Sequence, residues 1–207
     1  MKTVLIIIII LTSFNSFSQD FEGEIKYVIS AKTKFDVKIP IKLENSIGSI
    51  STFLTKRGAY KQETNSTFMA LQIYLPKEGK LYYKNNIESD TLRVKDVQKI
   101  ESQVYEYEIV KNADTILGYI CDKLIQKTNS TQQDFYYCAD LKLNPSYFKD
   151  FVAFEKKEVT EIIKSVFLRS DLIYPNLTIS YLAVEVKRRK IKDEEFDLPK
   201  NQIIVKD

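Results

Sequence analysis

The stretch that decides the fold is DTILGYICDKLIQKTNSTQQDFYYCADL, residues 114–141. Two apolar, aromatic-rich runs flank the polar centre TNSTQQ, which predicts a β-hairpin with its tip at Asn129 and Ser130. The chain's two cysteines, Cys121 and Cys138, lie at equal sequence distances from this tip. Directly opposed antiparallel residues have Cα atoms about 4.5–5.5 Å apart, a separation that a disulfide tolerates. We therefore expect a Cys121–Cys138 disulfide rather than a catalytic thiol, which would need a partner to lower its pKa.

The first eighteen residues have the pattern of a cleaved signal peptide. Lys2 precedes the apolar run Val4–Leu11, and the small residues Ser16 and Ser18 precede a cut ahead of Gln19. The apolar run is far shorter than the roughly 20 residues that a membrane-spanning helix needs, so no transmembrane anchor is expected. The sequence predicts a soluble exported protein, periplasmic or secreted, in a compartment where disulfides form.

Residues 19–207 are expected to form a single domain, because their number suits one sizeable core and no repeat or linker interrupts them. The formal net charge of +3 is mild. No basic stripe is interleaved with stacking aromatic residues, so a nucleic-acid partner is not expected.

Alternation of apolar and polar residues predicts that the chain is dominated by β-strands. The clearest case is Phe21–Ile29, where every second residue is apolar or small. Pro40 would remove one ladder donor from a strand over residues 37–43 and place it at an edge. The other predicted strands cover residues 47–54, 59–64, 69–75, 80–84, 90–94, 102–110, 177–186 and 203–205.

Helical patterns come only late in the chain. Asn144-Pro145-Ser146 has the residues of a helix start. Apolar residues then recur with helical spacing over residues 159–167. An antiparallel sheet packed on one or two helices inserted late predicts the α+β class.

Residue types that carry common chemistries are missing from the sequence. The chain has no histidine, which excludes Ser-His and Cys-His nucleophiles and the usual zinc site. Its five glycines are isolated, so there is no glycine-rich loop to hold a phosphate. We expect no metal, no cofactor and no enzymatic activity.

Several short segments resemble the GLPGLI-type exported proteins and their relatives. They are ILGYIC at residues 116–121, FYY at 135–137, FEGEIKY at 21–27 and FDLP at 196–199. The resemblance implies a LolA-like fold, the lipoprotein-carrier class, over residues 19–207. In that fold a strongly curved antiparallel sheet, an open or half barrel, wraps around helices. It implies no catalytic residues.

Two interpretations of the inward-facing aromatic residues remain open. They either fill a core or line an apolar pocket for a lipid-like ligand, in which case a cavity of about 300 Å³ or more should lie between helix 159–167 and the sheet. With a filled core, the protein would be a structural or interaction protein that binds an envelope partner through its surface or sheet edge. The candidate lining residues are Tyr27, Tyr82, Tyr105, Tyr107, Phe151, Ile163 and Phe167.

One basic cluster stands out near the C-terminus: Lys187, Arg188, Arg189 and Lys190. Such a cluster either contacts anionic head groups or an acidic partner, or forms the solvated end of a strand. The sequence leaves both interpretations open.

Overall fold

The computed structural model describes the chain from residue 20 to residue 206, except for residues 36–37 and 99–103. The predicted signal peptide, residues 1–18, lies outside the described part. The side chain of Tyr105, one of the candidate lining residues, also lies outside it.

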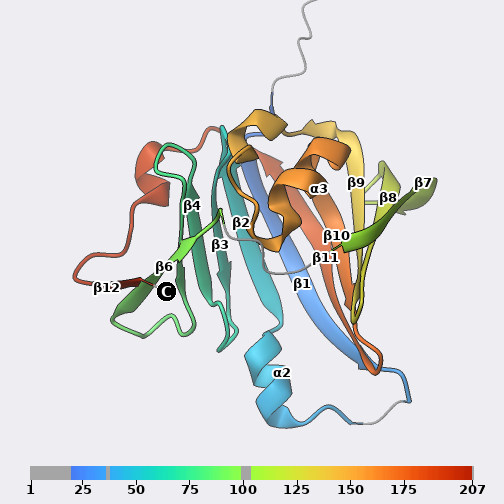
Figure 1. Ribbon diagram of the computed structural model, residues 1–207, viewed down its shortest axis with the longest axis horizontal. Helices are drawn as coiled ribbons and strands as arrows, with labels where there is room; N and C mark the ends of the chain where they lie inside the picture. Colours follow the sequence, from blue (N-terminus) through green and yellow to red (C-terminus); the bar gives the residue numbers. More distant parts are fainter. Residues whose placement is uncertain (1–19, 36–37, 99–103, 207) are drawn as a thin grey trace, which may run out of the picture.

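Twelve strands form one sheet. They are β1 (Gly23–Thr33), β2 (Ile50–Lys56), β3 (Ala59–Thr64), β4 (Leu71–Leu75), β5 (Lys80–Lys84), β6 (Thr91–Asp96), β7 (Val104–Ile116), β8 (Tyr119–Thr128), β9 (Gln132–Lys142), β10 (Ser165–Ile173), β11 (Leu177–Arg188) and β12 (Ile203–Lys206). Their order across the sheet is β12-β6-β5-β4-β3-β2-β1-β11-β10-β9-β8-β7 (Figure 1). The first strand therefore lies inside the sheet, between β2 and β11.

Short helices accompany the sheet. The α-helices are α2 (Ile41–Ile47) and α3 (Lys156–Ile163), and the 3₁₀ turns are η1 (Pro145–Phe148), η2 (Ala153–Glu155) and η3 (Asp193–Phe196). Figure 1 shows α3 and its neighbouring turns over one face of the sheet, whereas α2 lies at the sheet's lower end. The predicted helix start is confirmed, because the Asn144 side chain caps η1 by accepting a hydrogen bond from the Ser146 N–H at 3.0 Å.

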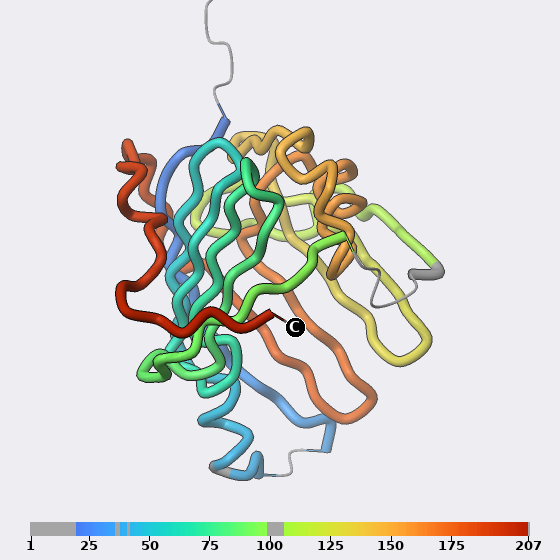
Figure 2. Tube along the Cα trace, turned by 60° about the vertical axis from the view of Figure 1, so that its left-hand side comes forward, coloured from blue at the N-terminus to red at the C-terminus, as the bar shows by residue number. Residues whose placement is uncertain are grey.

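The predicted fold class, α+β with a strongly curved sheet, is wrong. The protein is mostly β, and its sheet is neither closed nor strongly curled. The sheet is also mixed, because β12 pairs with β6 in parallel, and Figure 2 shows this C-terminal segment running beside β6. With 7 and 8 residues, α2 and α3 are too short to form a helical layer around which a sheet could wrap.

Two local predictions fail where a short apolar run fits both helix and strand. The strand predicted over residues 37–43 gives way to α2, which begins after Pro40 at a position where the missing proline N–H costs no hydrogen bond. The helix predicted over residues 159–167 ends at Ile163, because Lys164 adopts a left-handed conformation with φ 47°. The residues after Lys164 belong to β10.

The hairpin that decides the fold is confirmed, and so is its register. Strands β8 and β9 pair from Lys127 with Gln132 through Asp122 with Tyr137, and the Thr128 N–H closes the tip on the carbonyl of Thr131 at 2.9 Å. In each pair the two residues lie at equal sequence distances from the predicted tip, as the two cysteines do.

The predicted disulfide, however, is not formed, and Cys121 and Cys138 are buried free thiols. Counted from the hairpin tip, the β8–β9 ladder ends at Asp122, so it does not reach the neighbouring Cys121. The carbonyl of Cys138 accepts a hydrogen bond from the Ser165 hydroxyl at 2.6 Å, and the Cys121 thiol donates to the carbonyl of Tyr119 at 3.4 Å. The two strands thus bond to other partners at the cysteines.

The hydrophobic core lies mainly between the sheet and the η1–α3 segment. Tyr74 of β4 packs there against Phe148 and Phe151, with ring centroids 5.6 and 4.6 Å apart. Neighbouring strand residues point to opposite faces, so Ile73 and Tyr82 belong to a second cluster on the other face, where Leu198 packs against them. Both faces of β4 and β5 are therefore buried.

Close packing of η1 on the sheet depends on a glycine in the β2–β3 turn. Gly58 has φ 79°, a conformation that side chains rarely adopt, and a Cβ atom built there would lie 2.2 Å from Cβ of Tyr147. Only a glycine lets the turn and η1 approach this closely.

Candidate functional site: an aromatic cavity under α3

A cavity of about 360 Å³ lies between α3 and the sheet, where the ligand-binding interpretation expected one. Strands β1 to β4, β9 and β10 contribute to its wall, together with the η1–α3 segment. The aromatic side chains of the wall include Tyr27, Phe53, Tyr60, Phe135, Phe151 and Phe167. From α3 come Lys156, Val159, Thr160 and Ile163.

The rings on the sheet side are held in place by one another and by the backbone. The ring centroid of Phe167 is 5.6 Å from that of Tyr27 and 5.8 Å from that of Phe135. The Tyr27 hydroxyl donates a hydrogen bond to the carbonyl of Phe167 at 2.8 Å. This bond satisfies a buried polar group and fixes Tyr27 of β1 against β10.

Four of the predicted lining residues form part of the wall: Tyr27, Phe151, Ile163 and Phe167. Tyr82 does not, since it lies on the other face of the sheet and donates a hydrogen bond to Glu78 at 2.6 Å. Tyr107 is also outside the wall and is 36 % exposed. Alternation could not distinguish the two faces of β5, which is buried on both sides, and it could not show that β7 around Tyr107 is exposed.

Lys156 is the charged residue of the wall, and sequence reasoning missed it together with rings such as Tyr60 and Phe135. Its ammonium nitrogen lies 5.3 Å from the ring centroid of Phe148 and 5.7 Å from that of Tyr60. Burial lowers the pKa of Lys156 to about 8. Its position three residues before Val159 and seven before Ile163 places it on the apolar face of the helix, and this spacing could have identified it.

Tyr60 contributes a second polar group to the cavity. Burial, and then the neighbouring Tyr74, raise the pKa of Tyr60, so its hydroxyl stays protonated and can donate. No side chain or backbone group of the described residues forms a hydrogen bond with that hydroxyl. The hydroxyl of Ser165, by contrast, is 2.6 and 2.9 Å from the carbonyls of Cys138 and Leu141.

The backbone around α3 is strained at both ends. Phe154 and Glu155 precede the helix with φ values of 59° and 50°, and Lys164 follows it with φ 47°. Each of these residues adopts the left-handed region that side chains disfavour. Such strain is held in place by the surrounding structure and often accompanies binding sites.

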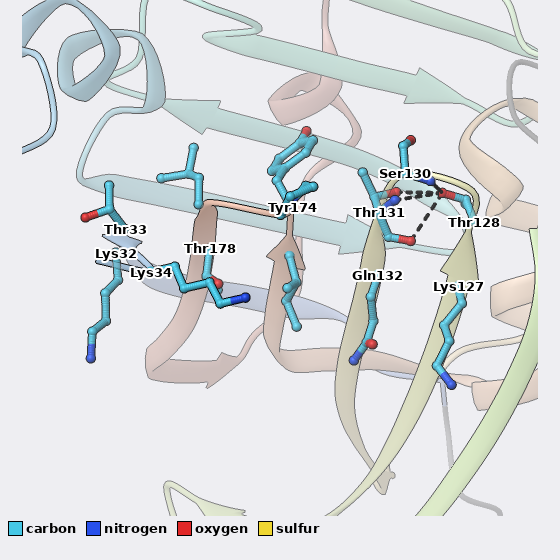
Figure 3. A pocket seen from close by; sticks show the side chains of 13 residues that line it. Lys32, Thr33, Lys34, Lys127, Thr128, Ser130, Thr131, Gln132, Tyr174 and Thr178 are labelled. Atoms are coloured by element: carbon cyan, nitrogen blue, oxygen red, sulfur yellow. Dashed lines mark hydrogen bonds between the residues drawn. The ribbon is translucent and has the colours of Figure 1, made fainter. Parts of the chain in front are cut away.

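A second hollow, of about 520 Å³, lies between the end of β1 and the tips of the β8–β9 and β10–β11 hairpins, and it is more open than the cavity under α3. Figure 3 shows Lys32 and Lys34 on one side of it and the tip of the β8–β9 hairpin on the other. The tip hydroxyls already bond within the hairpin, with Oγ1 of Thr128 2.9 Å from Oγ1 of Thr131. The hollow is therefore an open surface depression, and the hydroxyls of Thr128 and Thr131 at its edge have local partners.

The predicted basic cluster at the end of β11 is largely paired within the chain. Lys187 forms an ion pair with Glu185 at 2.8 Å, and Arg188 donates to the carbonyl of Asp140. The carboxylates that surround Arg189 raise its pKa, since this guanidinium lies 2.8 Å from Glu195 and 3.1 Å from Glu24. Lys190 is exposed.

The described residues contain no group of three or more histidine, cysteine, aspartate and glutamate side chains that could hold a metal ion. Of their helices, none is long and apolar enough to cross a membrane.

Comparisons with known proteins give little. No protein-family model matches the chain, and no curated protein matches it. The chain is similar to a solved structure described as "Structure of PNGF-II in P21 space group", with 11% sequence identity and a TM-score of 0.39. The similarity covers 89% of this chain and 32% of the other, so the chain spans about a third of that protein's length. At this TM-score the similarity establishes neither a shared fold nor a shared function.

Proposed function

We propose that this chain is an exported, non-catalytic protein that binds an apolar small molecule in the cavity under α3. The observation that carries the proposal is the cavity itself. Protein cores are close-packed and hold few voids larger than a water molecule, whereas ligand sites occupy about 300–1,000 Å³. A space of about 360 Å³ walled by aromatic rings has the size of a ligand site and is much larger than an ordinary packing void.

The export part of the proposal rests on the N-terminal sequence, where a short charged segment and an apolar run precede small residues. Kinship with the GLPGLI-type exported proteins is part of the same proposal and rests on the segments around residues 116–121 and 21–27. The proposed binding role depends on neither, because it follows from the cavity.

A role through the sheet edge has one observation in its favour. The edge strand β12 exposes Ile203 and Ile204, at 64% and 57% of their surface. An edge strand presents unpaired backbone groups to which another chain can add. If this role holds, the purified protein should self-associate, and Ile204→Lys should reverse the association.

The binding role is tested by filling the cavity from its half-buried side. Leu172 lines the cavity, whereas its strand neighbour Ile173 does not and points to the opposite face. Leu172→Trp should weaken binding of the neutral apolar dye N-phenylnaphthylamine by about tenfold or more, because the indole occupies the dye's volume. Ile173→Trp is the matched control and should bind as the wild type does.

Fluorescence titration of the dye gives the dissociation constants, with circular dichroism to verify that both variants are folded. Saturable binding that only the cavity variant loses is the expected result. Failure of the wild-type protein to bind the dye, or equal binding by both variants, contradicts the proposal.

A further inference from the structure

The cavity under α3 has a single charged side chain. Among the described residues that line it, Lys156 alone carries a charge, and no carboxylate lies in the wall. The Lys156 side chain is half-buried, and a charged group that loses part of its hydration is normally paired with an opposite charge. The ring faces of Phe148 and Tyr60 attract the ammonium, but cation–π contacts offset only part of the lost hydration.

The acidic residues nearest in sequence lie elsewhere. Glu155 accepts a hydrogen bond from Gln126 at 3.4 Å. Burial, and then Glu158 and Glu155, raise the pKa of Tyr107 to about 12, which places both carboxylates beside β7. No ion pair joins either of them to Lys156 in the described part of the chain.

We infer that the cavity takes an apolar monocarboxylate of medium length, whose carboxylate pairs with the ammonium of Lys156 and whose hydrocarbon part lies among the aromatic rings; this inference rests on the proposed function. A carboxylate would supply the missing opposite charge through a charge-assisted hydrogen bond. The Tyr60 hydroxyl, which lacks a protein partner among the described residues, is available as a second donor to the same carboxylate.

The charge and the volume narrow the ligand class further. One ammonium balances one negative charge, so a monoanion fits better than a phosphate monoester with nearly two charges. At about 30 Å³ for each water-sized group, a cavity of about 360 Å³ holds roughly twelve non-hydrogen atoms. Decanoate has this size and serves as the probe, and decanol is its neutral counterpart.

The main test compares these two probes on three proteins by isothermal titration calorimetry. The wild type should bind decanoate about tenfold or more tightly than decanol, the usual scale of a charge-assisted hydrogen bond. Lys156→Met keeps the length of the side chain without its charge and should lose this preference while still binding decanol. Lys149→Met removes an exposed lysine outside the wall and should behave as the wild type does.

A pH series gives a second readout. As the pH rises from about 7 to about 9, Lys156 loses its charge and decanoate binding should weaken by about tenfold, whereas decanol binding should not change. The titratable and charged groups on the elements packed around Lys156 include Tyr27, Tyr60, Tyr74, Tyr107, Glu155, Glu158 and Lys95. Burial raises the pKa of all four tyrosines, so they stay neutral over this range.

Lys156→Arg keeps a permanent charge and should retain the decanoate preference without the pH dependence. Equal decanoate affinity of the wild type and Lys156→Met, with decanol bound by both, overturns the inference and leaves the proposed function intact. If the wild type binds neither the dye nor decanol nor decanoate, the proposed function fails together with the inference.

Discussion

The charge state of Lys156 should leave a signature in the stability of the ligand-free protein. Burial lowers the pKa of Lys156 from the ordinary 10.5 to about 8. Below about pH 8 both the folded and the unfolded chain carry this proton, and the folded state bears the full cost of a poorly hydrated ammonium. Between about pH 8 and 10.5 the unfolded chain keeps the proton that the folded chain has released, so stability increases with pH over this window.

The size of the effect follows from the two pKa values. One pKa unit corresponds to about 1.4 kcal/mol, so the ammonium destabilises the folded state by about 3 kcal/mol below pH 8. Lys156→Met lacks the titrating group. The free energy of unfolding of this variant minus that of the wild type should therefore decrease by about 3 kcal/mol between about pH 7 and pH 10.5.

Urea unfolding followed by far-ultraviolet circular dichroism measures this difference, because the chain has no tryptophan to report on unfolding. Buried tyrosines such as Tyr27 also titrate differently in the two states at high pH, but they are present in both proteins and cancel in the difference. A constant difference for Lys156→Met would refute the reasoning, because it would mean that the ammonium is well hydrated inside the folded protein.

Three further predictions concern the framework. Arg169→Met should lower the free energy of unfolding in urea by about 3 kcal/mol, because it leaves the buried carboxylate of Asp171 without its partner at 2.7 Å. Adding Asp171→Asn to this variant should recover part of the loss. If it does not, the ion pair is not the cause. Gly58→Ala should lower stability by more than the roughly 1–2 kcal/mol of a left-handed residue, since its Cβ also clashes. Gly79→Ala, with open space around its Cβ, should cost that smaller amount alone, and equal losses would contradict the packing argument. Burial raises the pKa of the Cys121 thiol to about 11, so Cys121 and Cys138 should not react with iodoacetamide in the folded protein. Both should react once the protein is unfolded in urea, with no reductant added. Thiols that stay unreactive in urea would instead indicate a disulfide.

Sequence reasoning succeeded where one local feature dominates. The polar tip around Asn129 sets the register of the β8–β9 hairpin by itself, and the observed pairing of Asp122 with Tyr137 follows from it. The alternation that begins at Phe21 identifies β1, whose inward residues are buried as expected. Both features can be identified from residues that are neighbours in the sequence.

It failed where a distant contact decides between alternatives. Whether Val166 and Phe167 continue a helix depends on the left-handed Lys164 and on pairing with β9, neither of which periodicity reveals. Tyr82 is buried on the face of the sheet opposite the cavity, because the C-terminal segment covers that face. The importance of Lys156 depends on rings from β3 and η1, since in sequence it is one of two adjacent lysines followed by a glutamate.

The place of β1 inside the sheet has a consequence for how the molecule is made. This strand pairs with β2 on one side and with β11 on the other, and Gly23 lies opposite Arg188. A ribosome must therefore release nearly the whole polypeptide before the N-terminal strand can find its second neighbour. Until then the two halves of the sheet each present an open edge, so the nascent chain needs protection from aggregation.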